Sequence, residues 1–218
     1  MKFGIKVYKY TKELEEFENL ADFIEVMAIE KGDYSFFKNL KIPVIIHSQH
    51  QIFGVNNADP VKREKNLSSI NFARKLADMT GAKKIILHPG QVNNENCSEK
   101  EAVDFIKILD DKRIIIENLP ARGGSLCTIP EETERFMKLT EKGLCFDINH
   151  AIETCIYLKK DYLQMIKEFL MLKPKHYHIG GQKLDGSSHL NFSESEVDLK
   201  KIIMIKTQTS RTQLIKPI

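Results

Sequence analysis

The stretch Gly143-Leu-Cys-Phe-Asp-Ile-Asn-His-Ala151 joins an apolar run to a carboxylate and an imidazole. Its run 144–146 is typical of a buried strand, which Asp147 ends, and His150 follows three residues later. A carboxylate on a strand end and an imidazole on the next turn can together hold a cation. An aspartate after a strand is more often the N-cap of a helix. The stretch therefore indicates a metal ligand only if other strands end in the same way.

Apolar runs alternate with amphipathic segments along the whole chain. We expect strands at 3–8, 23–29, 42–46, 85–87, 114–116, 144–147 and 176–179, with helices at 14–20, 60–80, 99–109, 131–139 and 157–172. Uninterrupted Ile, Val and Leu runs between helices indicate a parallel sheet that is buried on both faces. No Gly-rich phosphate loop follows the first strand, which disfavours a dinucleotide-binding fold.

Polar residues stand where these strands end. They are Glu25, His47, His88, Glu117, Asp147 and His178, separated by 22, 41, 29, 30 and 31 residues. One strand and its following helix take about 30 residues, so the same chemistry recurs once per unit. Seven such units predict an α/β fold of the (β/α)8 TIM-barrel type, as a single domain over residues 1–218.

The C-terminal part is short for a complete barrel. A helix is expected to start near Asp198, and residues 200–218 contain no acidic residue. We place the eighth strand at 213–218, with 202–206 as the alternative. A full eighth helix does not fit the remaining chain, so we expect a barrel that is minimal or incompletely closed. An open edge of this kind would favour a homodimer.

In a barrel, the carboxyl ends of all strands meet on one rim. The candidate ligands on that rim are His47, His88, Glu117, Asp147, His150 and His178, with His189 on the loop after the seventh strand. Imidazole and carboxylate groups bind Zn²⁺, Mn²⁺ or Fe²⁺, and a carboxylate can bridge two ions. Each residue alone is more simply a helix cap or a core group, but their shared position favours a metal site. His50 and His176 are interpreted as rim or surface groups, and His176 also as a residue that supports the site.

The motifs and their order resemble the xylose isomerase-like TIM barrels, which include endonuclease IV and the sugar-phosphate isomerases and epimerases. They are Ile46-His47-Ser48 with Asn56, Leu87-His88-Pro89-Gly90, Ile116-Glu117-Asn118, Phe146-Asp147 with His150, His178-Ile-Gly-Gly and Ser188-His189-Leu190, and they cover roughly residues 23–199. By position, endonuclease IV implies a first metal on His47, His88 and Glu117. It implies a second on Glu117, Asp147 and His178, and a third on His150 and His189.

Two positions depart from the pattern that the resemblance implies. Ser187 stands where an aspartate precedes the Ser-His pair, although Asp185 is close by. A lysine, Lys216 or Lys206 according to the placement of the eighth strand, stands where a glutamate is expected. We therefore expect one or two ions, Zn²⁺ or Mn²⁺, centred on Glu117.

The resemblance implies a divalent-metal-dependent sugar or sugar-phosphate isomerase or epimerase, with a small-molecule substrate. Glu117 would be a ligand and the candidate base, and Lys216 a second catalytic group. The expected substrate contacts are Glu25, Asn118 and His176, and a cap or an ion pair is an equally open interpretation of Glu25.

The alternative is an endonuclease IV-like phosphodiesterase that acts on abasic DNA, favoured by His47 and His88. The net charge of +3 and the absence of tryptophan speak against a nucleic-acid partner. A degenerate barrel without activity is the third interpretation.

Composition places the chain among ordinary globular proteins, with 42% hydrophobic and 29% charged residues. No apolar run approaches the ~18 residues of a membrane span, and the N-terminus lacks the apolar core of a signal peptide. Cys97, Cys127, Cys145 and Cys155 form no CxxC pair. We expect reduced thiols in a cytoplasmic protein without membrane partners.

Overall fold

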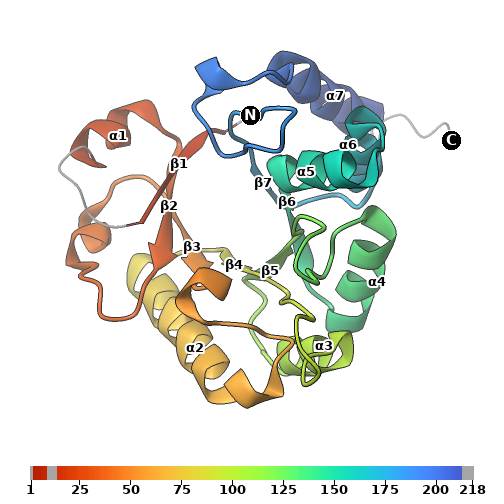
Figure 1. The fold of residues 1–218 in the computed structure, drawn as a ribbon. Helices are drawn as coiled ribbons and strands as arrows, with labels where there is room; N and C mark the ends of the chain where they lie inside the picture. Colours follow the sequence, from red (N-terminus) through yellow and green to blue (C-terminus); the bar gives the residue numbers. More distant parts are fainter. Residues whose placement is uncertain (1, 9–13, 213–218) are drawn as a thin grey trace, which may run out of the picture. The chain divides into compact units, whose positions relative to one another are not determined.

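A computed structural model describes residues 2–8 and 14–212. The chain divides into two compact units, unit 1 over residues 1–116 and unit 2 over residues 117–218. The seven strands follow one another in chain order from β1 to β7, and the strand pairs whose register is described are parallel (Figure 1).

Unit 1 is built of alternating strands and helices. Its elements are β1 (Gly4–Val7), α1 (Leu14–Leu20), β2 (Phe23–Ala28), η1 (Ser35–Asn39), β3 (Val44–Ser48), η2 (Gln51–Phe53), η3 (Pro60–Lys62), α2 (Arg63–Thr80), β4 (Ile85–Leu87), α3 (Glu99–Lys107) and β5 (Ile114–Glu117), whose last residue belongs to unit 2. Helix α2 packs on β2 and β3 with Ile70, Ala73 and Leu76 buried (Figure 1). Gly81 ends α2 as expected, because its φ of +69° is left-handed and its N–H bonds the carbonyl of Ala77.

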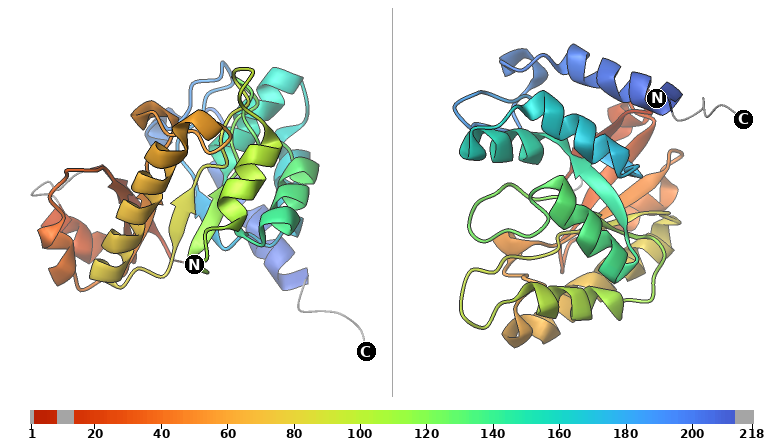
Figure 2. Two further views of the ribbon diagram at one scale, coloured as in Figure 1. Left: turned by 90° about the horizontal axis from the view of Figure 1, so that it is seen from below. Right: turned by 90° about the vertical axis from the view of Figure 1, so that its right-hand side faces the viewer.

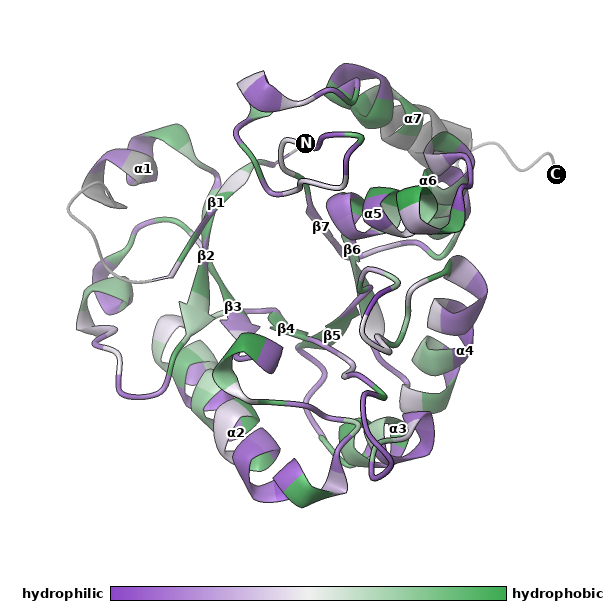
Figure 3. Cartoon of the chain, viewed as in Figure 1, coloured by the Kyte–Doolittle hydropathy of each residue, from purple (hydrophilic) through white to green (hydrophobic). Residues whose placement is uncertain are grey.

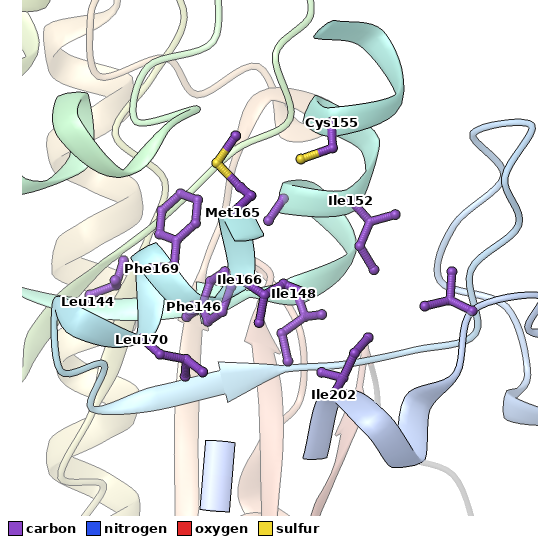
Figure 4. Packing of buried hydrophobic residues seen from close by; sticks show 12 residues of the cluster. Leu144, Phe146, Ile148, Ile152, Cys155, Met165, Ile166, Phe169, Leu170 and Ile202 are labelled. Atoms are coloured by element: carbon purple, nitrogen blue, oxygen red, sulfur yellow. The ribbon is translucent and has the colours of Figure 1, made fainter. Parts of the chain in front are cut away.

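Unit 2 continues the alternation. It contains α4 (Pro130–Thr140), β6 (Gly143–Asp147), α5 (Ile148–Leu158), α6 (Tyr162–Met171), β7 (His176–His178), η4 (Phe192–Glu194) and α7 (Leu199–Thr212). Helix α6 packs against α5 and α7 (Figure 2). Figure 4 shows the core that these helices share with β6, where the rings of Phe146 and Phe169 stack with centroids 4.8 Å apart. This core fixes the strand that carries Asp147.

Two expectations about unit 2 are wrong. The helix expected at 157–172 is two helices, because Lys159 takes a left-handed φ of +54° and Asp161 caps a new helix. Helix α5 starts directly after Asp147, so no spacer separates it from β6, and its residues 148–155 are buried. The alternative eighth strand at 202–206 is part of α7.

The expected fold class is confirmed as an α/β, TIM-barrel-like sheet that is incompletely closed. Over residues 2–8 and 14–212 the sheet has seven strands. The preferred eighth strand at 213–218, which includes Lys216, lies outside the described residues. Lys206, the alternative lysine, belongs to α7.

Figure 3 shows hydrophobic residues along the strands and both hydrophobic and hydrophilic residues on the helices, as a sheet covered by helices requires. Among the described helices, none has the length and apolar character needed to cross a membrane. All four cysteines are buried and none forms a disulfide, as expected.

Candidate metal centre

The inner cluster consists of Glu117, Asp147 and His178, the last residues of β5, β6 and β7. His178 Nδ1 lies 3.4 Å from Glu117 Oε1 and 3.6 Å from Asp147 Oδ2. Both carboxylates are almost fully buried, and ligand atoms of the three residues lie within 4.8 Å of one another. The expected convergence of these strand ends is therefore present within unit 2.

The spacing of the inner cluster fits a small divalent cation. Hydrogen bonds between nitrogen and oxygen are usually about 2.7–3.2 Å long, which is shorter than both His178 separations. Ligands held about 2.1 Å from a tetrahedral ion lie about 3.4 Å apart. Two buried carboxylates and one imidazole also form a donor set that Zn²⁺ and Mn²⁺ accept. The two separations from His178 therefore match those between ligands of such an ion.

The two oxygens of Asp147 have different neighbours. Oδ1 accepts a hydrogen bond of 3.0 Å from the backbone N–H of His150 and caps α5, whereas Oδ2 faces His178. Burial raises the pKa of Asp147, but attraction to the imidazoles of His150 and His178 outweighs it, so the pKa lies below its usual value. Both interpretations of this aspartate, helix cap and charged candidate ligand, are compatible with the structure.

Asn118 fixes the distance between the ends of β5 and β6. Its Oδ1 accepts a hydrogen bond of 2.7 Å from the N–H of Asp147, and its Nδ2 donates one of 2.9 Å to the carbonyl of Asp147. These two bonds, which we call the Asn118 clamp, join the residue after Glu117 to the backbone of Asp147. The sequence suggested a substrate contact for Asn118, which stays a prediction.

The outer cluster consists of Asp147, His150 and His189, whose ligand atoms also lie within 4.8 Å of one another. His150 Nδ1 lies 2.8 Å from the carbonyl oxygen of Asn118. A carbonyl only accepts, so Nδ1 carries the ring proton and Nε2 keeps its lone pair for a ligand. Asp185, the possible substitute for the missing aspartate, instead bonds the N–H of Ser187 in its own loop at 2.8 Å.

A short hairpin places His189, which is exposed and has a left-handed φ of +57°. Gly181 and Leu190 exchange two backbone hydrogen bonds of 2.7 and 3.0 Å across it. A Cβ on Gly181 would overlap the carbonyl oxygen of Asn191, so the close approach requires glycine. Asn149 on α5 bonds the N–H and carbonyl of Gly180, which joins the hairpin to the helix that carries His150.

Unit 1 brings His47, His50 and His88 together. The ring centroids of His47 and His88 lie 5.2 Å apart, and His50 stacks on His88 at 4.6 Å. His50 was expected at the rim or the surface, and the surface alternative is wrong, because it is 7% exposed.

Two of these rings have a defined tautomer. His47 Nδ1 lies 2.8 Å from the carbonyl of Ser48, and His88 Nδ1 lies 3.0 Å from Oε1 of Gln51. Each Nδ1 therefore donates to an oxygen, as the second ring nitrogen of metal-ligating histidines does. No sequence motif predicted the hydrogen bond between His88 and the side-chain oxygen of Gln51.

Glu25 and His176, two expected substrate contacts, are buried, so a surface position of His176 is wrong. Glu25 was expected at a strand end, which is also wrong, because it lies inside β2. Glu25 Oε1 lies 3.4 Å from Nζ of Lys6, the ion pair that the sequence left open beside a substrate role. His176 packs its ring 5.4 Å from the ring of His178. Their role in substrate binding stays a prediction.

Comparison with known proteins identifies the family of the chain. A protein of Mycoplasmoides gallisepticum named probable endonuclease 4 is 25% identical over 195 residues, which are 75% of this chain and 64% of that relative. The chain therefore spans less than two thirds of that relative's length. A sequence profile of the xylose isomerase-like TIM barrels matches residues 29–205.

Two solved structures share the fold. A D-tagatose 3-epimerase-like protein has a TM-score of 0.72 at 19% identity, over 96% of this chain and 87% of its own. Endonuclease IV from Thermus thermophilus has a TM-score of 0.65 at 17% identity, over 91% of this chain and 80% of its own. Because the family profile covers most of the sequence, the chain belongs to the xylose isomerase-like TIM barrel family.

Proposed function

We propose that this protein is a divalent-metal-dependent isomerase or epimerase of a sugar or sugar phosphate. The observation that carries the proposal is the inner cluster, in which two buried carboxylates and an imidazole lie at metal-ligand spacing on successive strand ends. Zn²⁺ or Mn²⁺ is the expected cofactor, as one or two ions. The structural likeness to an epimerase-like protein is consistent with this chemistry.

Each residue of the inner cluster has a separate task in the proposed reaction. A bound ion would polarise the carbonyl and hydroxyl oxygens of the substrate. Asp147 and His178 hold the ion, while Glu117 is both a ligand and the group that removes the proton from the adjacent carbon. The Asn118 clamp keeps the two carboxylates in place during that transfer. Lys216 is proposed as the second proton-transferring group.

An endonuclease IV-like phosphodiesterase on abasic DNA is the second candidate. The Nδ1 hydrogen bonds of His47 and His88 favour it, because metal-ligating histidines usually donate their other ring nitrogen to an oxygen. Against it, Ser187 replaces the aspartate of the outer position, and Asp185 bonds its own loop instead. These departures rank the isomerase first.

Elemental analysis of the purified protein, followed by two assays, tests the proposal. Exchange of a C–H proton with deuterated water in a panel of sugars and sugar phosphates supports the isomerase, and nicking of an abasic duplex supports the endonuclease. Glu117→Gln should lower either activity by about 10²–10⁴-fold. Glu131→Gln, an exposed carboxylate on α4, is the matched control.

Each result has a defined meaning. Retained activity in Glu117→Gln would remove Glu117 from the chemistry. A protein that binds neither Zn²⁺ nor Mn²⁺ would leave only the degenerate barrel.

A further inference from the structure

A thiol lies directly behind the inner cluster. Cys145 precedes Asp147 by two residues on β6, and His176 precedes His178 by two residues on β7. Residues two apart on a strand share a face, so Cys145 and His176 form the next layer on the face that carries the candidate ligands. The strand register places them opposite each other, since Cys145 pairs with His176 and Asp147 pairs with His178.

Cys145, His176 and His178 form a compact group, which we call the thiol cluster. Cys145 Sγ lies 3.8 Å from His178 Nε2, and the rings of His176 and His178 stand at 89° with centroids 5.4 Å apart. Ligand atoms of all three lie within 4.8 Å of one another. Sulfur and nitrogen bound to one tetrahedral Zn²⁺ are about 3.6 Å apart, close to the observed 3.8 Å.

We propose that the thiol cluster is a second cation position, which takes a soft divalent ion such as Cd²⁺ on one thiolate and two imidazoles. Thiolate and imidazole select soft ions, whereas the carboxylates of the inner cluster suit harder ones. Cation binding by the thiol cluster is independent of the proposed function. Its effect on an ion in the inner cluster, described below, rests on that function.

The ring of His178 couples the two positions. Its Nδ1 faces Glu117 and Asp147, and its Nε2 faces Cys145. A neutral imidazole has one proton and one lone pair. When Nδ1 binds an ion in the inner cluster, Nε2 carries the proton and points it at the sulfur. When Nε2 binds a soft ion, the proton sits on Nδ1 and faces the two carboxylates, and Cys145 loses its thiol proton to water.

The two positions therefore compete for one histidine. A soft ion in the thiol cluster withdraws His178 from the inner cluster, so thiophilic metals would inhibit an enzyme that hard metals activate. This competition requires no movement of either strand, because a tautomer change suffices.

Titration of the metal-free protein with Cd²⁺ tests the proposal, through the ultraviolet absorption of a thiolate–cadmium bond. Wild type should develop this band, and Cys145→Ser should not. Cys155→Ser is the matched control, because Cys155 is buried in the same unit within the hydrophobic core of Figure 4. Burial raises the pKa of the Cys155 thiol to about 11, which keeps it protonated. Cd²⁺ binding without the band would overturn the proposal.

Two further variants separate the thiol cluster from the inner cluster. His176→Gln should weaken Cd²⁺ binding about tenfold or more while leaving Mn²⁺ binding intact. Glu117→Gln should keep the cadmium band, and a band that disappears with Glu117 would contradict a separate position. If Cys145→Ser fails to fold, the ¹¹³Cd resonance of wild type reports sulfur coordination without any substitution.

A third experiment measures whether Mn²⁺ competes with Cd²⁺ for the protein. Excess Mn²⁺ should raise the apparent Kd for Cd²⁺ in wild type, and less so in Glu117→Gln. Equal Kd values with and without Mn²⁺ would refute the sharing of His178. A protein with the cadmium band but no activity on sugars or DNA would retain this inference and lose the proposed function.

Discussion

Asp147 combines a structural and a chemical task in one side chain, and the two can be separated. Asparagine caps helices as well as aspartate does but carries no charge, whereas alanine does neither. Asp147→Asn should therefore lose most of its metal affinity while keeping the stability of α5. Asp147→Ala should lose the affinity and about 1 kcal/mol of unfolding free energy as well. Calorimetric metal titration and urea denaturation measure the two effects, and equal stability of both variants would contradict the cap.

The charged residues of the candidate site were the part most accessible from sequence. A strand that ends on Glu117 or Asp147 is visible as an apolar run that stops at a carboxylate, and the repeat of about 30 residues predicts convergence. The residues that position these charged groups could not be predicted from the sequence. The clamp by Asn118, the oxygen of Gln51 on His88 and the burial of His50 depend on contacts between distant residues, which no local pattern encodes.

At the scale of elements, the hairpin of Gly181 and Leu190 decides where His189 lies. Gly181→Ala should open it, because the added Cβ overlaps the Asn191 carbonyl. Gly186→Ala is the control, since Gly186 has a φ of +98° but an added Cβ would meet no atom within 4 Å. The control should cost about 1 kcal/mol through backbone strain. Gly181→Ala should cost more and should also weaken any metal bound by His150 and His189, as thermal denaturation and metal titration would show.

A second element-scale prediction concerns Arg113, which joins the start of β5 to the end of α2. Its guanidinium bonds Asp111 at 2.8 Å and Asp78 at 2.7 Å. The hydrogen bond from Arg113 holds the pKa of Asp111 below its usual range, so this pair contributes stability above the unfolded pKa of about 3.9 and loses it as pH falls through the lower folded pKa.

Asp111→Asn should therefore destabilise the protein by about 1–2 kcal/mol at neutral pH and by less in acid. Urea denaturation at several pH values measures the difference. Asp104→Asn, which removes an exposed pair with Lys100, should change little at any pH. An Asp111→Asn effect that does not shrink in acid would exclude the charge as its cause.

The boundaries of some helices could be predicted from the sequence, and those of others could not. Helix α2 and Gly81 were predictable because an amphipathic period ends in a residue that accepts a left-handed φ. Helix α5 was missed because it begins directly at the end of β6, so no spacer in the sequence marks its start. The prediction of the fold class does not depend on α5, because seven apolar runs at regular spacing determine it.

At the scale of the whole molecule, a resident metal should act as a stabilising ligand. An ion at about 100 times its Kd adds about 2.7 kcal/mol to the unfolding free energy. Removal with a chelator should therefore lower the Tm, and added Zn²⁺ or Mn²⁺ should restore it. Glu117→Gln provides the control, because its Tm should respond little to either treatment. A wild-type Tm that changes neither with the chelator nor with added metal would argue against a resident ion.

The Asn118 clamp has a consequence for ionic size. Because bonds of 2.7 and 2.9 Å tie the residue after Glu117 to Asp147, the two carboxylates have little freedom to move apart. Ca²⁺ requires 6–8 oxygens at about 2.3–2.6 Å and a pliable shell, which such a frame does not offer. For an ion bound at the inner cluster, we therefore expect the clamp to favour the size of Zn²⁺ or Mn²⁺ over that of Ca²⁺.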